Sequence, residues 1–177
     1  MYEGGIREPL LVRWPGVVPP GRVTGTPVSR PDFFATLLEA AGAPPQAHQT
    51  LDGTSLLPVF KGGSLPERAL FWHYPHYGNQ GGAPAAAIRR GDWKLIEWAE
   101  DQRVELFNLR TGLSEQTNLS GDQPRRAAQL LNELHAWQKQ TGSKFPTPNP
   151  DYDPAKPSGR AAQRPAARAK PNSSKKP

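Results

Sequence analysis

The loop at residues 73–84 contains the residue types best suited to contact a small ligand. His73, Tyr74, His76 and Tyr77 lie there among glycines and prolines. An imidazole can donate a hydrogen bond to an anion, and aromatic faces suit sugar or aryl rings. Two histidines with no third ligand nearby make a poor zinc site, because zinc takes three or four protein ligands. The simplest interpretation is a structural loop, and contact with a sugar or aryl substrate is the functional alternative.

A second candidate stretch begins at Tyr2 and places Glu3 and Arg7 on either side of two glycines. These charged side chains could serve an active site, but an ion pair that holds a turn is the more common role for such a pair. Gly4 and Gly5 are expected to adopt backbone angles that other residues resist. The stretch therefore predicts a tight turn held by an ion pair.

A thiolate nucleophile and a cluster of metal ligands are both missing from the sequence. The chain has no cysteine, which excludes thiolate chemistry, disulfides and cysteine-based zinc sites. Asp52, Asp92 and Asp101 each stand alone in turn-like sequence, whereas a hard cation takes several converging oxygen ligands. We therefore predict no thiolate nucleophile and no metal ligand in this chain.

The basic character of the chain is concentrated at its C-terminal end. Of the 22 Lys and Arg residues, seven lie in residues 155–177, which contain no acidic residue. Residues 1–154 carry the other 15, against 16 acidic side chains, so this part is close to neutral. The basic segment also lacks aromatic residues on which bases could stack. We interpret residues 155–177 as a disordered basic tail and expect no nucleic-acid partner.

The N-terminal third of the chain is typical of part of an α/β layer. Residues 9–14, PLLVRW, form an apolar run closed by Pro-Gly, which predicts a strand. Ser29, followed three residues later by Asp32, is a capping-box-like start for a helix that Gly42 would end. Residues 56–60 offer a small apolar anchor within the loop that follows.

The next part is predicted to be an antiparallel sheet covered by one helix. Short β-forming runs separated by turns indicate a meander, and an apolar stripe at helical spacing indicates a helix that needs a partner surface. Lys94 is expected on a solvated strand face, and Trp93, Trp98 and Trp137 in the core between sheet and helix. The predicted strands are residues 69–72, 86–89, 93–98 and 104–109, and the predicted helix starts after Gln123 and ends at Gly142.

Five segments, in this order, resemble the C-terminal portion of the type I, formylglycine-dependent sulfatases, the arylsulfatase family. YEGGIREPLLVRWPG is similar to that family's YEGG-x-R-x-P segment and the strand after it. LDGTSLLPVFKG resembles its D-G-x-S-L-x-P-x-L-x-G stretch, and ELFNLRTGLSEQTNL its E-L-Y-N-L segment. DFFATLLEAAG matches the helix between the first two, and LFWHYPHYGNQGGAPAAAIRRGDWKLIEW the start of a small C-terminal subdomain. The resemblance covers residues 2–154.

The resemblance implies an alkaline-phosphatase-like α/β sulfatase fold, of which this chain would be a C-terminal fragment. Residues 1–66 would be the end of the catalytic domain. Residues 67–154 would be a small antiparallel four-stranded sheet packed by a C-terminal helix, with the disordered basic tail after it. The structural motif near the active site would be Tyr2, Glu3, Gly4, Gly5 and Arg7.

The chemistry of the family requires parts that this sequence lacks. In the family, a Cys or Ser oxidised to formylglycine attacks the sulfur of a sulfate ester, and calcium polarises the sulfate. Ser64 begins a loosely similar SLPER sequence, but Glu67 replaces the small residue of the motif, and a turn before a strand is the better interpretation. Calcium and formylglycine are therefore expected only in a complete enzyme, with the missing N-terminal sulfatase domain. The resemblance therefore implies that this chain holds no catalytic residue and is inactive alone.

The expected partner of a complete enzyme is a sulfated carbohydrate or an aryl sulfate, contacted by His73, Tyr74, His76 and Tyr77 of the loop at residues 73–84. The alternative function is a non-catalytic module that binds sulfated carbohydrate. No window of the sequence approaches the roughly 18 apolar residues of a membrane span, and no signal peptide is recognised. The family is mostly exported, to the periplasm or outside the cell, while the sequence itself leaves the compartment unknown.

Overall fold

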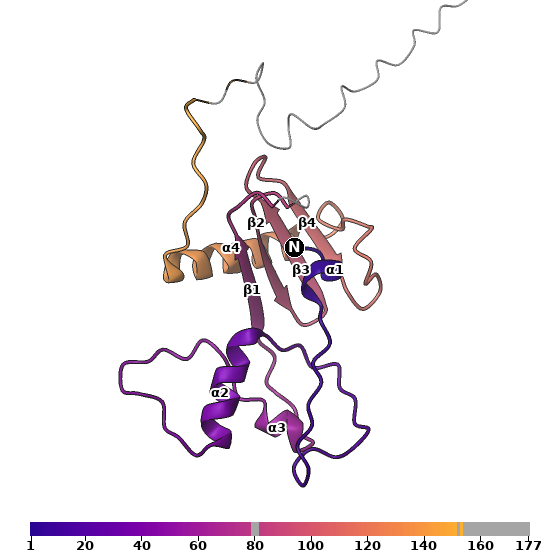
Figure 1. Cartoon of the computed structure of the whole chain (residues 1–177). Helices are drawn as coiled ribbons and strands as arrows, with labels where there is room; N and C mark the ends of the chain where they lie inside the picture. The colour runs from indigo at the N-terminus through magenta and orange to yellow at the C-terminus, as the bar shows by residue number, and fades with distance from the viewer. Residues whose placement is uncertain (79–81, 152, 154–177) are drawn as a thin grey trace, which may run out of the picture.

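The computed structural model describes residues 1–78, 82–151 and 153. In this part of the chain, a four-stranded sheet lies against one long helix, and two shorter helices lie beyond one end of the sheet (Figure 1). No helix among the described residues is long and apolar enough to cross a membrane. The predicted tail at residues 155–177 lies outside the described residues. The elements are α1 (Glu3–Ile6), α2 (Arg30–Ala40), α3 (Leu57–Phe60), β1 (Ala69–Tyr74), β2 (Ala85–Arg90), β3 (Trp93–Trp98), β4 (Val104–Asn108) and α4 (Pro124–Thr141).

The sheet is the antiparallel meander that the sequence predicts, with strand order β1-β2-β3-β4. Its register aligns Phe71 with Ile88, Ile88 with Leu95, and Leu95 with Leu106. Residues that oppose each other across antiparallel strands project to the same face, so this row forms one apolar surface. The short turns between consecutive strands account for the meander, because such turns join neighbouring antiparallel strands.

Helix α4 covers that apolar row, as the stripe in its sequence predicts. Ala127, Leu130 and Leu134 are buried against the sheet. The ring of Trp137 stacks on Phe71 with a centroid separation of 4.8 Å. The helix ends at Gly142, whose φ of +64° is readily adopted only by glycine.

The opposite face of the sheet carries a second core. It contains the buried side chains of Ala85, Ala87, Ile96, Phe107 and Leu109, with Met1, Trp72 and Trp98 packed against them. The prediction that Trp98 lies between sheet and helix is therefore wrong. Trp98 is two residues beyond Ile96 on β3, and alternate residues of a strand share a face. The segment around α1, and not α4, covers this side (Figure 1).

Helix α2 begins with the predicted capping box and is held by polar contacts. The fully buried carboxylate of Asp32 accepts hydrogen bonds from the backbone N–H of Ser29 (2.6 Å) and of Thr54 (2.9 Å). Arg68, just before β1, makes a two-pronged ion pair with the same carboxylate. Gly53 allows this approach, because a Cβ there would lie 2.2 Å from the backbone of Pro31. Burial alone would raise the pKa of Asp32, but the bonds from Arg68, Thr54 and Ser29 outweigh it and lower that pKa.

Residues 9–14 form no strand in the described part of the chain, contrary to the prediction. A strand is stabilised by hydrogen bonds to a neighbouring strand, and the four described strands pair only with one another. The side chains of Leu10, Leu11 and Val12 are exposed. The sequence has the composition of a strand, and the described residues offer it no partner.

Candidate functional site: the Tyr2–Arg7 turn and the histidine and tyrosine loop

The turn from Tyr2 to Arg7 is a single turn of helix. The Tyr2 carbonyl accepts a hydrogen bond from the N–H of Gly5, and the Glu3 carbonyl accepts one from the N–H of Arg7, both at 2.9 Å. The prediction of unusual backbone angles at Gly4 and Gly5 is wrong. Neither residue has a positive φ, and a Cβ on either would meet nothing within 4 Å.

A buried cluster of charges ties this turn to the sheet. Lys94 on β3 is 0% exposed, and its Nζ lies 3.0 Å from Glu3 Oε1 and 2.9 Å from Glu115 Oε1. The other oxygen of Glu115 accepts a hydrogen bond from the backbone N–H of Glu3. Arg89 lies 3.7 Å from Glu3 Oε2. The cation of Lys94 therefore offsets two buried carboxylates from distant parts of the chain.

Lys94 was expected on a solvated strand face, and that expectation is wrong. Its neighbours in the alternating pattern, Ile96 and Trp98, already indicate a covered face, and this was the available signal. Nothing in the sequence marked Glu115, which lies 21 residues further on in an irregular segment. Glu115 has a φ of +53°, which is uncommon for a residue with a side chain. In this conformation the Glu115 carboxylate contacts both the backbone N–H of Glu3 and the ammonium group of Lys94.

Tyr2 adds a polar and an aromatic contact to the same face. Its hydroxyl donates a hydrogen bond of 2.7 Å to Glu105 Oε2. Its ring centroid lies 5.9 Å from that of Trp98 and 6.2 Å from that of Phe107. Burial, together with the hydrogen bond to Glu105 and the charge of that carboxylate, raises the pKa of Tyr2 to about 12. The hydroxyl is thus a neutral donor over the whole physiological range.

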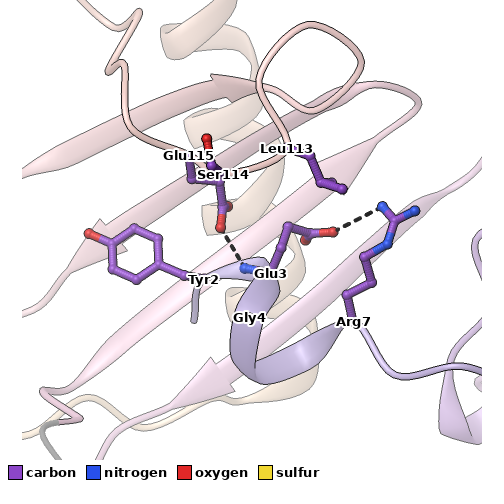
Figure 2. A pocket seen from close by; sticks show the side chains of 7 residues that line it. All are labelled: Tyr2, Glu3, Gly4, Arg7, Leu113, Ser114 and Glu115. Carbon is purple, nitrogen blue, oxygen red and sulfur yellow. Dashed lines mark hydrogen bonds and ion pairs between the residues drawn. The ribbon is translucent and has the colours of Figure 1, made fainter.

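An open hollow of about 770 Å³ lies beside the turn. Figure 2 shows Glu3 between Glu115 on one side and Arg7 on the other, with Leu113 at the rim. The ion pair expected between Glu3 and Arg7 is present at 3.6 Å, and the side chain of Arg7 is 52% exposed. Because Lys94 already offsets the carboxylates, the exposed guanidinium of Arg7 is the charge best placed to meet a ligand or another polypeptide. The remaining lining residues are Tyr2, Gly4 and Ser114.

In the loop with the two histidines, His73 and Tyr77 contact other parts of the chain. His73 Nε2 lies 2.9 Å from the carbonyl oxygen of Lys144, and the His73 ring packs edge-on against Phe145. The Tyr77 hydroxyl donates a hydrogen bond of 2.7 Å to Glu100. These contacts give His73 and Tyr77 structural partners.

His76 and Tyr74 contact each other in the same loop. Their rings pack edge to face with centroids 5.6 Å apart. The side chains of Tyr74, His76 and Tyr77 are all exposed, so all three remain accessible for contact with a substrate. Whether they make that contact stays a prediction.

The buried carboxylates do not fit a calcium site. Asp32 is paired with Arg68, and Glu3 and Glu115 share Lys94. A calcium site instead needs several oxygens that converge without a competing cation. Within residues 1–78, 82–151 and 153, no three His, Asp or Glu side chains gather in a way that could hold a metal ion. Arg68, the arginine of the SLPER sequence, forms an ion pair with Asp32.

The sheet and the helices belong to the class of alkaline-phosphatase-like sulfatase folds, because the chain superposes on the putative sulfatase yidJ from Bacteroides fragilis with a TM-score of 0.62 over 75% of this chain and 29% of that chain. Residues 1–141 match the family model described as N-sulphoglucosamine sulphohydrolase, C-terminal. The chain belongs to this sulfatase family and represents its C-terminal portion.

Relatives with curated names are sulfatases of greater length. The chain is 38% identical over 152 residues to a sulfatase of Formosa agariphila, covering 77% of this chain and 28% of that protein. It is 42% identical over 120 residues to human N-acetylgalactosamine-6-sulfatase, covering 68% of this chain and 22% of that protein. The chain thus spans about a quarter of the length of these relatives.

A solved structure shares the fold over most of the described chain. The crystal structure of Ps i-CgsB superposes with a TM-score of 0.58 and 30% sequence identity, covering 75% of this chain and 29% of that chain. The same protein is also known in complex with k-i-k-neocarrahexaose. The family match over residues 1–141 confirms the predicted C-terminal sulfatase portion.

Proposed function

We propose that this chain is the C-terminal part of a sulfatase that, when complete, hydrolyses sulfate esters of sugars or aryl alcohols. The observation that carries the proposal is the match of residues 1–141 to a sulfatase C-terminal family, while the chain spans only 28% and 22% of two sulfatase relatives. The names of these relatives, and the oligosaccharide bound to Ps i-CgsB, favour a sulfated carbohydrate as the substrate.

We further propose that the chain does not hydrolyse sulfate esters by itself. It has no cysteine that could become formylglycine. Ser64 is the one serine in a loosely similar sequence, and Arg68 of that sequence is paired with Asp32. The buried carboxylates are offset by Lys94 and Arg68, so they are poor ligands for the calcium that the family uses. Calcium and formylglycine would therefore come with the rest of a sulfatase.

The proposed division of labour follows the two regions of the chain. Residues 1–66 would complete the catalytic domain, and residues 67–154 would form the small subdomain beside it. The turn at residues 2–7 crosses this boundary, since Glu3 pairs with Lys94 and Tyr2 with Glu105. It would hold the hollow beside it at a set position relative to the sheet. The loop with Tyr74 and His76 would add contacts that select the substrate.

An activity assay tests the proposal directly. The purified full chain is incubated with p-nitrophenyl sulfate and calcium, and release of nitrophenol is followed. We expect no turnover above that of buffer, and turnover above it would contradict the inactivity. Binding of sulfated oligosaccharides is then measured by calorimetry. Tight binding without turnover would favour the alternative, a non-catalytic carbohydrate-binding module.

A further inference from the structure

A second hollow, smaller than the one beside the Tyr2–Arg7 turn, lies between the β2–β3 hairpin and the first turns of helix α4. Its volume is about 220 Å³. Pockets for drug-sized ligands begin at roughly 300 Å³, so this hollow suits a smaller unit such as a single sugar ring. We call it the hairpin pocket. Its polar and aromatic lining comes from Glu67, Arg90, Asp92, Trp93, Arg126 and Gln129.

Trp93 supports the exposed side chain of Arg126 at this pocket. The guanidinium carbon of Arg126 lies over the Trp93 ring, 4.5 Å from its centroid. The ring attracts the cation, and the planar guanidinium keeps N–H donors at its edge for a ligand. Trp93 is itself anchored, because it packs against the core between the sheet and α4. An arginine supported in this way loses less side-chain entropy when it binds a ligand.

The two arginines that line the hairpin pocket differ in their partners. Arg90 donates a hydrogen bond of 3.0 Å from its Nε to Glu133 and a second one from a terminal nitrogen. The hydrogen bonding to Glu133, with the charges of Glu133 and Glu67, outweighs partial burial and raises the pKa of Arg90. Arg126, by contrast, pairs with no carboxylate among residues 1–78, 82–151 and 153. Its charge is therefore available to an anion.

Exposed partners for hydroxyl groups surround Arg126. The carboxylates of Glu67 and Asp92 accept hydrogen bonds, and the amide of Gln129 both donates and accepts them. Arg110 lies 3.3 Å from Asp92 and offsets part of its charge. The two carboxylates disfavour a ligand with several adjacent negative charges, such as a polyphosphate. One available cation among several hydroxyl partners instead fits a sugar ring that carries a single anionic group.

We propose that the hairpin pocket binds one sulfated sugar residue of a carbohydrate chain. The sulfate would accept two hydrogen bonds from the guanidinium of Arg126, and the ring hydroxyls would bond to Glu67, Asp92 and Gln129. The choice of a sulfated sugar rests on the proposed function, which takes a sulfated carbohydrate as substrate. The pocket shares no lining residue with the hollow beside the Tyr2–Arg7 turn. It would therefore hold a polymeric substrate at a contact of its own.

The test is an NMR titration of the isotopically labelled full chain with a κ-carrageenan hexasaccharide, whose only charged groups are sulfates. We expect the amide signals of residues 90–93 and 126–130 to shift. The indole N–H signal of Trp93, assigned by its absence in Trp93→Phe, should shift with them. The desulfated hexasaccharide should bind about tenfold more weakly, because it lacks the charged acceptor for Arg126.

A matched pair of variants makes the test specific to Arg126. Arg125 and Arg126 are adjacent exposed residues of α4, and only Arg126 lines the hairpin pocket. Arg126→Gln should weaken binding of the sulfated hexasaccharide about tenfold, and Arg125→Gln should leave it unchanged. Arg126→Lys keeps the charge without the planar fork, so its affinity should lie between those of Arg126→Gln and the unaltered chain. Glutamine has a high helix propensity, so circular dichroism should show the same helix content in each variant.

Four outcomes would overturn the hairpin pocket as a site for a sulfated sugar. They are no binding to the unaltered chain, equal binding of the desulfated hexasaccharide, equal weakening by the two glutamine variants, or signal shifts confined to residues 113–115 beside the turn. The p-nitrophenyl sulfate assay reports separately on the proposed function, because that substrate has no sugar to enter the pocket. An empty pocket would therefore leave the proposed function standing, and the result of that assay would leave the pocket standing.

Discussion

Replacing Lys94 by methionine tests the buried charge cluster at its centre. The ammonium group is fully buried and lies within 3.0 Å of both Glu3 and Glu115. Methionine keeps most of the volume of the side chain and removes the charge. Two carboxylates would then remain buried, with only the more distant Arg89 (3.7 Å) and Arg7 (3.6 Å) near Glu3. We expect a marked loss of stability because unpaired buried charge is costly.

The magnitude follows from the burial of all three partners. Breaking a buried ion pair by removal of one partner costs about 3 kcal/mol or more. With a urea dependence of roughly 1.5 kcal/mol per molar, this lowers the midpoint of urea unfolding by about 2 M. The assay is urea unfolding followed by tryptophan fluorescence, because Trp98 lies on the same face of the sheet as Lys94. Lys139→Met, at an exposed position of α4, is the matched control and should shift the midpoint little.

A second substitution separates lost packing from uncompensated charge. Glu115→Gln in the Lys94→Met background removes one of the two orphaned negative charges and should restore part of the stability. The same Glu115→Gln change in the unaltered chain should destabilise, since it weakens the contact with Lys94. A Lys94→Met variant as stable as Lys139→Met, or no recovery in the double variant, would refute the reasoning.

Three further predictions concern the contacts of the same two regions. The pKa of Asp32 is lowered in the folded chain, so its ion pair stabilises the fold above about pH 4, where a free carboxyl is ionised, and this stabilisation is lost as pH falls through the lower folded pKa. The difference in melting temperature between the unaltered chain and Asp32→Asn, measured from pH 6 to 2.5, should therefore narrow with acid. The raised pKa of Tyr2, about 12, means that its neutral hydroxyl stabilises the fold below pH 10 and that this stabilisation is lost as pH rises from 10 to 12. In an ultraviolet titration, Tyr2→Phe should lack the phenolate that forms near pH 12 in the unaltered chain. If the variant instead lacks a step near pH 10, the hydrogen bond to Glu105 is contradicted. Gly53→Ala should lower the free energy of thermal unfolding by about 2 kcal/mol, because its Cβ would meet the Pro31 backbone. Gly4→Ala, whose Cβ would meet nothing within 4 Å, should leave that free energy unchanged. Equal effects of the two substitutions would be evidence against the close approach at Gly53.

Local patterns were sufficient to predict the sheet and both longer helices. The capping box at Ser29 and the glycine at position 142 mark helix ends through contacts within a few residues. The alternation in residues 93–98 separates Leu95, which faces α4, from Ile96 and Trp98 on the opposite face. These signals are local, so the sequence near each element contains them in full.

The contacts of the candidate site depend on residues far apart, and the sequence did not reveal them. The partner of His73 is the carbonyl of Lys144, 71 positions away, and a backbone acceptor has no sequence signature. The charge of Lys94 predicts a solvated face, whereas its strand neighbours Ile96 and Trp98 indicate a covered one. The strand predicted at residues 9–14 fails for another reason, since strand formation depends on a partner that a single segment cannot specify.

Glu3 contacts residues far along the chain, and this separation predicts that the Tyr2–Arg7 turn folds late. Glu3 is hydrogen-bonded to residues 91 and 112 positions later, on β3 and in the segment after β4. Closing so long a loop costs more chain entropy than forming a meander of neighbouring strands. The sheet and α4 can therefore assemble while the Tyr2–Arg7 turn is still detached. In pulse-labelled refolding, we expect amides of β2 and β3 to be protected first and the N–H of Glu3 to be protected last.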